Sequence, residues 1–274
     1  MHTLLAVNNL NVSYGRADAS QQHAVQDVSF DIGAGEVRGR MGESGCGKTS
    51  IALAILGLLS NEQAHISGSI QFLGKELMEI DQSALRSIRG AGISMVFQEP
   101  GLALNPVMQV RDQVAEVIHA HKDLKWKQCG ENAESGLVRA GLASNQRIFS
   151  AYPHQLSKGQ QQRVVLAQAL ACEPALVIAD EPTASLDARS QDELLGLLRE
   201  LQRELRISIL LISHNAEVQA HLADRLMVIK HGRIVEQGRF EELYRNPAHA
   251  CTRAMLRTVA PADIAEDLDL EMVT

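Results

Sequence analysis

The residues best suited to chemistry form one run, Gly42-Glu43-Ser44-Gly45-Cys46-Gly47-Lys48-Thr49, which Ser50 follows. The run fits the pattern G-x-x-x-x-G-K-[ST], in which glycines let backbone amides turn inward around phosphate oxygens. The residues before it read as a strand (36–41) and those after it as an apolar helix (51–59), which is the context the pattern needs. We expect the whole run, Ser50 included, to bind a nucleotide, with Lys48 on the β- and γ-phosphates and Thr49 on Mg²⁺. A plain glycine-rich turn is the alternative.

Three apolar segments each end at a polar residue of catalytic type: residues 93–97 at Gln98, residues 176–179 at Asp180-Glu181, and residues 209–213 at His214. Because ligands of open parallel sheets lie at the carboxyl ends of the strands, we expect these side chains to meet the glycine-rich run. Asp180 and Gln98 are expected to hold Mg²⁺ together with Thr49, and the Gln98 amide is also expected to take part in catalysis by contacting the attacking water. Glu181 is placed to accept a proton from an attacking water, and His214 to contact the γ-phosphate. For His214 alone, a surface or capping histidine is the competing interpretation.

A second candidate anion site begins at Leu156-Ser157-Lys158-Gly159-Gln160. Ser157 is a good N-cap residue, and a long helix is predicted over residues 160–171. A helix start with a free hydroxyl and a glycine backbone suits a negatively charged ligand, although an ordinary helix cap has the same sequence.

Length and composition limit the classes of protein to consider. The 274 residues carry a net charge of −7, which argues against a nucleic-acid partner. The longest apolar run, residues 51–59, is too short to span a bilayer, and the N-terminus lacks the features of a signal peptide. The cysteines have no zinc-site spacing and are expected to be reduced thiols of a cytosolic protein: Cys46, Cys129, Cys172 and Cys251.

Hydrophobic patterning predicts an α/β fold. Residues 4–13, 24–32 and 66–73 alternate as strands do, and residues from about 99 to 172 show helical periodicity. Short apolar strands between helices then predict a parallel sheet covered on both faces, and His231-Gly232 predicts a hairpin. We expect one domain over residues 1–245, with the helical segment inserted, and an extension over 246–274 that ends in an acidic, solvated tail.

These residues resemble the motifs of the ATP-binding-cassette (ABC) ATPases. The match follows the order of that family's motifs and includes the glycine-rich run, Gln98, residues 156–160, residues 180–181, residues 185–187 and His214. The resemblance covers roughly residues 4–238 and implies a P-loop NTPase fold, with a mainly parallel core sheet, an N-terminal antiparallel β subdomain and a helical insertion. It implies ATP and Mg²⁺ as ligands, with Tyr14 stacked on adenine. It also implies a dimer of cassettes, in which Ser157, Gly159 and Gln160 of one subunit face the nucleotide on the other and Asp187 lies at the interface.

A finer resemblance is to the oligopeptide, dipeptide and nickel importers. It is carried by residues 43–48, Gln98-Glu99-Pro100, Leu104-Asn105-Pro106, residues 152–157, residues 232–238 and residues 246–249. It implies a peripheral ATPase at the cytoplasmic face of the inner membrane, with peptides, nickel or a metal chelate as cargo. The implied partners are a second cassette, like or unlike this chain, two membrane permease subunits and an extracytoplasmic binding protein.

Four departures from the family pattern leave alternatives open. Lys158 stands where the family usually has glycine, which raises the prospect of one weakened ATP site, while Asn215 after His214 changes little. Arg38 and Arg40 replace apolar residues in the strand before the glycine-rich run, and Ala250-Cys251-Thr252 departs from the branch's usual residues. A soluble ABC ATPase without a transport role and a partly degenerate cassette are therefore the competing functions.

Overall fold

The computed structural model describes residues 2–15, 22–42, 48–59 and 64–259. Packing divides the chain into two units: the first contains the residues up to Ile80 and those from Ser208 onward, and the second is Asp81–Ile207. Among the described residues, no helix combines the length and the apolar character needed to cross a bilayer. The predicted acidic tail and residues 43–47 lie outside the described residues.

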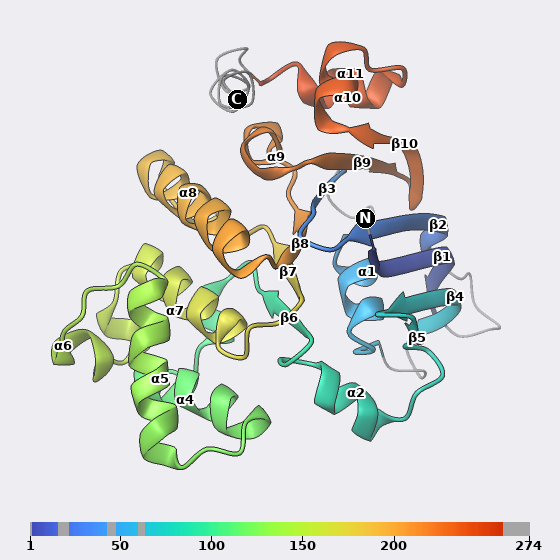
Figure 1. Ribbon diagram of the computed structural model, residues 1–274. Coiled ribbons are helices and arrows are strands. Elements are labelled where there is room, and N and C mark those ends of the chain that lie inside the picture. Colours follow the sequence, from blue (N-terminus) through green and yellow to red (C-terminus); the bar gives the residue numbers. More distant parts are fainter. Residues whose placement is uncertain (1, 16–21, 43–47, 60–63, 260–274) are drawn as a thin grey trace. The chain divides into compact units, whose positions relative to one another are not determined.

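An antiparallel sheet opens the first unit, with strand order β2-β1-β4-β5 (Figure 1). Its strands are β1 (Thr3–Tyr14), β2 (Gln22–Gly33), β4 (Ala64–Phe72) and β5 (Lys75–Glu76). The predicted N-terminal strands are thus confirmed. Alternation in β1 breaks at Asn9, whose φ is 48° and where the register with β2 shifts. Gly68 packs on this bulge so closely that a Cβ there would lie 2.6 Å from the carbonyl oxygen of Asn9, so only glycine fits.

Four more strands of the first unit pair in the order β10-β9-β3-β8. They are β3 (Val37–Gly42), β8 (Ser208–Ile212), β9 (Arg225–Lys230) and β10 (Arg233–Arg239). β3 is parallel to both β8 and β9, as the apolar runs predict. β9 and β10 form the predicted hairpin, whose turn residues His231 and Gly232 both have positive φ, at 49° and 76°.

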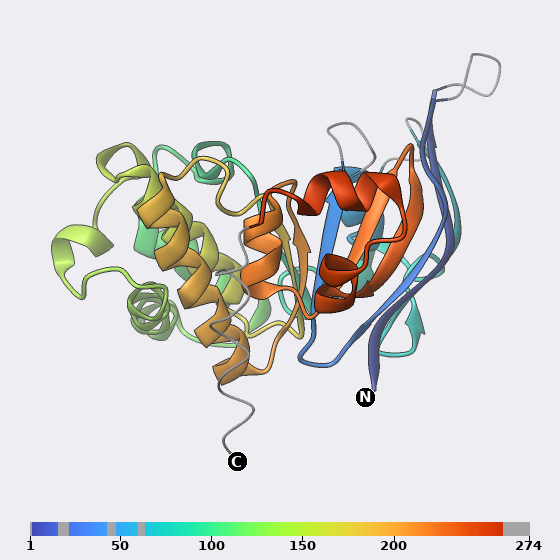
Figure 2. The same ribbon diagram turned by 90° about the horizontal axis from the view of Figure 1, so that it is seen from above.

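All six residues of β3 are buried, and the strand borders a hydrophobic core. Met41 packs with a cluster that includes Leu226, Val228, Phe240 and Leu256. The helices of this unit are α1 (Lys48–Ile55), α9 (Ala216–Leu222), α10 (Phe240–Arg245) and α11 (Ala250–Leu256), and Figure 2 shows α10 and α11 close to the β9–β10 hairpin. The sequence did not predict α9, α10 or α11, because helices of six or seven residues carry little periodicity.

Arg38, which the sequence left unexplained, belongs to a buried polar network. Its Nη2 donates to Gln237 Oε1 at 2.6 Å, and its Nη1 lies 3.8 Å from Glu36 Oε1. Arg225 shares the same carboxylate, because its Nε donates to Glu36 Oε1 at 2.6 Å and its Nη2 to Asp31 Oδ2 at 2.7 Å. Burial, followed by the neighbouring Arg225 charge, lowers the pKa of Arg38 although Glu36 and Asp31 oppose this. Arg40 is fully buried on the same strand.

Helices dominate the second unit, around the parallel pair β6 (Ile93–Val96) and β7 (Leu176–Asp180). The helices are α2 (Gln82–Ile88), α3 (Pro100–Ala103), α4 (Val110–His121), α5 (Trp126–Arg139), α6 (Gln146–Phe149), η1 (Pro153–Gln155), α7 (Lys158–Leu170) and α8 (Ala188–Leu205). This confirms the predicted helical insertion. In α8, Leu194, Leu198 and Leu201 are buried on one face.

One predicted helix has different limits. The apolar run over residues 51–59 predicts a helix to its end, but α1 ends at Ile55. Gly57 then adopts a φ of 60°, which a right-handed helix cannot include. Periodicity alone cannot locate this end, because the apolar residues continue beyond it.

Candidate functional site

In the first unit, two predicted site residues follow the carboxyl ends of neighbouring strands. β3 and β8 are parallel, with Arg40 opposite Ile212, so Gly42 and His214 each stand two residues beyond a paired position. His214 is exposed there. Glu43, Ser44, Gly45, Cys46 and Gly47, which the pattern assigns to the nucleotide, lie outside the described residues, and Lys48 is the first residue of α1. The end of strand β3 therefore precedes the undescribed part of the glycine-rich run, and the start of helix α1 follows it.

The first turn of α1 carries the next predicted residues. Thr49 is exposed, whereas Ser50 is buried and its Oγ lies 2.9 Å from the hydroxyl oxygen of Tyr14. Tyr14 is thus anchored beside the start of α1, more than thirty positions away in sequence. No sequence pattern predicts this hydrogen bond. The hydrogen bond to Ser50 holds the hydroxyl end of the Tyr14 ring in place. Stacking of the ring on adenine stays a prediction.

In the second unit, a similar edge holds the acidic residues. β6 and β7 are parallel with Val96 opposite Ala179, so Gln98 and Glu181 each follow a paired position by two residues. Gln98 is exposed, whereas Asp180 and Glu181 are each only 6% exposed. Two adjacent buried carboxylates at a strand end are costly unless they serve a ligand or are stabilised locally.

Glu181 has an unusual backbone. Its φ is 46°, in the left-handed region that a non-glycine residue enters at a cost of about 1 kcal/mol or more. The conformation starts a turn, in which the Ala184 amide donates to the Glu181 carbonyl oxygen at 3.2 Å. Such strain occurs at functional sites, but other described residues such as Leu73 and Arg206 share it, so the catalytic role of Glu181 stays a prediction.

The start of α7 is the second predicted anion site. Ser157 Oγ accepts from the Gln160 amide at 3.2 Å, and the Gln160 side chain accepts from the Ser157 amide at 3.0 Å, which makes a capping box. The Ser157 oxygen acts here as an acceptor, so its proton remains available to a ligand. The 13-residue helix directs its positive end toward this position.

Lys158 causes no backbone difficulty at this helix start. It is the first residue of α7, its φ is not among the positive values of the described residues, and its side chain is exposed. Glycine's wider conformational range is therefore not needed at this position, which removes one reason for expecting a weakened site.

Gly159 and Asp187 lie close together at the starts of α7 and α8. A Cβ on Gly159 would lie 3.9 Å from Ser190 Oγ and 4.0 Å from a Leu186 methyl, which is ordinary contact. Asp187 caps α8, accepting from the Ser190 amide at 3.0 Å and from the Ser190 hydroxyl at 2.8 Å. The Ser190 amide bond, then the hydroxyl bond, lowers the pKa of Asp187. The negatively charged cap of α8 is thus a neighbour of the predicted anion site at the start of α7.

Arg163 is a positioning residue that the sequence analysis missed. Its Nη1 donates to the Ala140 carbonyl at 3.3 Å and its Nη2 to Glu193 Oε2 at 3.3 Å, so α7 is tied to the end of α5 and to α8. Gly141, with a φ of 81°, leaves the room this side chain needs. The available signal was the arginine that closes the run Gln160-Gln161-Gln162-Arg163.

The donor set fits the expected ligands. A threonine hydroxyl (Thr49), an amide (Gln98) and a carboxylate (Asp180) all offer the oxygen atoms that Mg²⁺ prefers. Within the first unit the structure places Thr49, Ser50 and Tyr14 at the start of α1, and Gly42 at the end of β3. Within the second it places Gln98 near Asp180-Glu181, and Ser157 and Gly159 near Asp187.

Comparison with known proteins shows the family of this chain. The ABC transporter family profile matches residues 25–184. The dipeptide transport ATP-binding protein DppD of Bacillus subtilis (strain 168) is 40% identical over 265 residues, which cover 96% of this chain and 79% of that protein. The glutathione import ATP-binding protein GsiA of Escherichia coli (strain K12) is 38% identical over 97% of this chain, which spans only 44% of GsiA.

Solved structures agree with these relatives. The dimeric ATP-binding cassette MJ0796 in a post-hydrolysis state with ADP and Pi matches 86% of this chain and 98% of its own, with a TM-score of 0.76 and 26% identity. CbiO1 of Clostridium perfringens, part of the ABC transporter complex cbiONQ, matches 98% of this chain and 100% of its own, with a TM-score of 0.75 and 29% identity. Fold and strand-edge residues together define an ATP-hydrolysing cassette. This chain belongs to the ABC transporter family. The family, the fold class and the ATPase class expected from the sequence are confirmed.

Proposed function

We propose that this chain is the ATP-binding subunit of an importer, and that it hydrolyses MgATP between two cassettes to drive uptake of peptides. The names of its relatives support the direction and the cargo, since they specify dipeptide transport, glutathione import and peptide import. They favour peptides over the nickel and metal chelates that the sequence left open. The dimeric state of the similar cassette MJ0796 supports a paired arrangement.

The observation that carries the proposal is the strained, buried Glu181 next to Asp180, with Gln98 at the same strand edge. In the proposed reaction, the Glu181 carboxylate accepts a proton from water as the water oxygen attacks the γ-phosphorus, while the bond from that phosphorus to the β–γ bridging oxygen breaks and ADP leaves with this oxygen. His214 donates a hydrogen bond to the γ-phosphate, and Lys48 with the amides of residues 42–50 holds the phosphate chain. Mg²⁺, held by Thr49, Gln98 and Asp180, supplies charge neutralisation at the phosphates.

The start of α7 supports a second cassette as the partner. Ser157 and Lys158 are exposed. In its hydrogen bond with the Gln160 amide the Ser157 hydroxyl is an acceptor, so its proton can be donated to a bound ligand. We propose that Ser157 and the Gly159 amide contact the γ-phosphate bound by the other cassette, with Gln160 and Asp187 at the same interface.

Replacing Glu181 with glutamine tests the catalytic assignment. The change keeps the shape of the side chain but removes its basicity, so steady-state ATP hydrolysis should fall by about 100-fold or more. ATP affinity, measured by equilibrium titration, should stay within about threefold of the native value. Glu200→Gln, an exposed change on α8, is the matched control and should hydrolyse ATP at the native rate. Near-native hydrolysis by Glu181→Gln would refute the role.

An exposed apolar surface supports a membrane subunit as a further partner. Phe97, Leu102 and Val107 are 45%, 84% and 81% exposed, and they flank Gln98 and α3. Apolar side chains grouped beside a catalytic residue suit a docking partner that senses the site. We propose that a permease subunit docks here and thereby holds the chain at the cytoplasmic face of the membrane, while a binding protein delivers cargo on the other side.

Leu102→Asp tests this docking. The charged side chain should weaken co-purification with the membrane subunits at least about tenfold, while basal ATP hydrolysis by the isolated chain stays native. Leu73→Asp is the matched control, because Leu73 is 61% exposed on the β4–β5 turn of the first unit. Equal loss of co-purification in both variants, or in neither, would overturn the docking assignment.

A further inference from the structure

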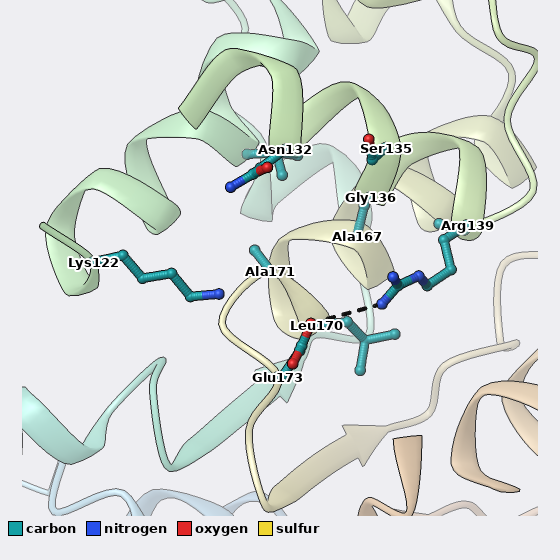
Figure 3. A pocket seen from close by; sticks show the side chains of 11 residues that line it. Lys122, Asn132, Ser135, Gly136, Arg139, Ala167, Leu170, Ala171 and Glu173 are labelled. Atoms are coloured by element: carbon teal, nitrogen blue, oxygen red, sulfur yellow. Dashed lines mark ion pairs between the residues drawn. The ribbon is translucent and has the colours of Figure 1, made fainter. Parts of the chain in front are cut away.

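A polar pocket of about 180 Å³ lies within the second unit, between α4, α5 and α7. Figure 3 shows Lys122 and Arg139 extending into it from opposite sides, toward Glu173 and Ala171. None of its lining residues belongs to the nucleotide site described above. The pocket therefore requires an explanation of its own.

The pocket has more positive than negative charge. Lys122 and Arg139 are its two cations, and Glu173 is its one carboxylate. Arg139 Nη1 lies 3.9 Å from Glu173 Oε1, too far for a hydrogen bond, so most of the guanidinium donors remain available. Lys122 is half-buried, and its ammonium makes no hydrogen bond or ion pair with any of the residues that the structure describes. A partly dehydrated cation without a counter-ion favours an anionic ligand.

Small residues create the space. Ala167 and Ala171 of α7 and Gly136 of α5 line the pocket, and a Cβ on Gly136 would meet no atom within 4 Å. Glycine inside a helix costs up to about 1 kcal/mol relative to alanine, so this sequence gives up stability to keep the space open. The volume of about 180 Å³ holds more than one water and suits a small ligand.

Asn132 supplies a polar group that fits such a ligand. Its side-chain amide lines the pocket and is exposed to it. Ser135 contributes less, because its hydroxyl donates to the Glu131 carbonyl oxygen at 3.1 Å and so offers only a lone pair. The donors in the pocket are thus two charged groups and one amide, which is a set suited to a planar or tetrahedral oxyanion.

We propose that this pocket binds a small anion bearing a carboxylate or phosphate group, with Lys122 and Arg139 as its main contacts. The anion bridges α4, α5 and α7 and replaces Glu173 as the partner of Arg139. Glu173 limits affinity, because its carboxylate repels the ligand.

Calorimetric titration of the full chain with succinate and with inorganic phosphate, at constant ionic strength, tests the proposal and separates the two ligand chemistries. At least one of them should bind with a dissociation constant of about 1 mM or tighter. Lys122→Met and Arg139→Met should each weaken binding by at least about fivefold. Lys127→Met is the matched control on α5, because Lys127 is 88% exposed and outside the pocket, and it should change nothing. Since the glycine-rich run is a second phosphate site, phosphate is also titrated into Lys48→Ala, which should retain binding to the pocket.

Two further variants act without removing a cation. Glu173→Gln should tighten binding by at least about threefold, because it removes the competing carboxylate. Gly136→Leu should abolish binding, since the new side chain fills the space while every charge remains, and it should not lower thermal stability. No heat with either anion, equal weakening by Lys127→Met, or full binding by Gly136→Leu would overturn the proposal.

Discussion

Replacing Gly159 with alanine separates what this chain's own fold requires from what a bound nucleotide requires. Gly159 is in α7 with an ordinary negative φ, and the added methyl would contact Ser190 and Leu186 at 3.9 and 4.0 Å. Neither strain nor overlap opposes the change. Alanine is the better helix former, so unfolding free energy should stay the same or rise by up to about 1 kcal/mol.

Function should respond in the opposite direction. In the proposed dimer, the Gly159 amide lies against the γ-phosphate of the other cassette, where a methyl group would hold that phosphate away. Loss of one such donor at a reacting oxyanion costs about 100-fold in rate, so ATP hydrolysis should fall by about that factor. The expected pattern is a protein at least as stable as the native one and nearly inactive.

Urea unfolding followed by circular dichroism, together with steady-state ATP hydrolysis, measures both quantities. Gly196→Ala is the matched control, because Gly196 is also a helical glycine, in α8, and an added Cβ there would meet no atom within 4 Å. It should gain stability and keep its full activity. Two results would refute the reasoning: native hydrolysis by Gly159→Ala, or a marked loss of stability on that change.

Three other changes have distinct expected outcomes. Lys158→Gly should lower unfolding free energy by up to about 1 kcal/mol, because the residue is helical, and it should not raise ATP hydrolysis; a large gain in activity would show a native site impaired by lysine. Arg38→Met should change the unfolding free energy by less than about 1.5 kcal/mol, because Arg225 still pairs with Glu36. Glu36→Ala should lower it by about 3 kcal/mol, because the buried cations lose their carboxylate. Equal losses of stability for the two variants in denaturant titrations would contradict this reasoning. Burial favours the neutral form of Glu76, but hydrogen bonds from Ser69 and nearby amides lower its pKa below the ordinary 4.5. The Glu76 carboxylate therefore stabilises the fold at neutral pH, and this stabilisation is lost as the pH falls through the pKa of the folded state. Glu76→Gln should be less stable than the native chain at pH 7, with the difference in stability shrinking at pH 3.5; a difference that grows in acid would refute this prediction.

Local sequence predicted those parts of the site that local geometry controls. Gln98 and Glu181 follow short apolar strands, and the parallel pairing of β6 with β7 is enough to bring them to one edge. Ser157 was predicted as a cap because serine before a long helix is a good N-cap residue, and in the structure its hydroxyl and the Gln160 side chain form a capping box. The motifs were informative because each lies at the end of a regular element.

Long-range contacts could not be predicted in this way. The Tyr14–Ser50 hydrogen bond joins a strand to a helix start, and the Arg38–Gln237 bond spans about two hundred residues. The left-handed backbone of Glu181 also has no sequence signal, since glutamate carries no preference for it. These features depend on packing between distant segments, which hydrophobic period and turn composition do not encode.

The central claim is that two copies of this fold, or this chain and a related cassette, enclose ATP between Lys48 of one and Ser157 of the other. Analytical ultracentrifugation of Glu181→Gln with ATP and Mg²⁺ tests it most directly, because that variant binds ATP without consuming it. We predict a species of about twice the 29.9 kDa chain mass that returns to the monomer when ADP replaces ATP. A variant that binds ATP but stays monomeric in the presence of Mg²⁺ and of any candidate partner cassette would contradict the account.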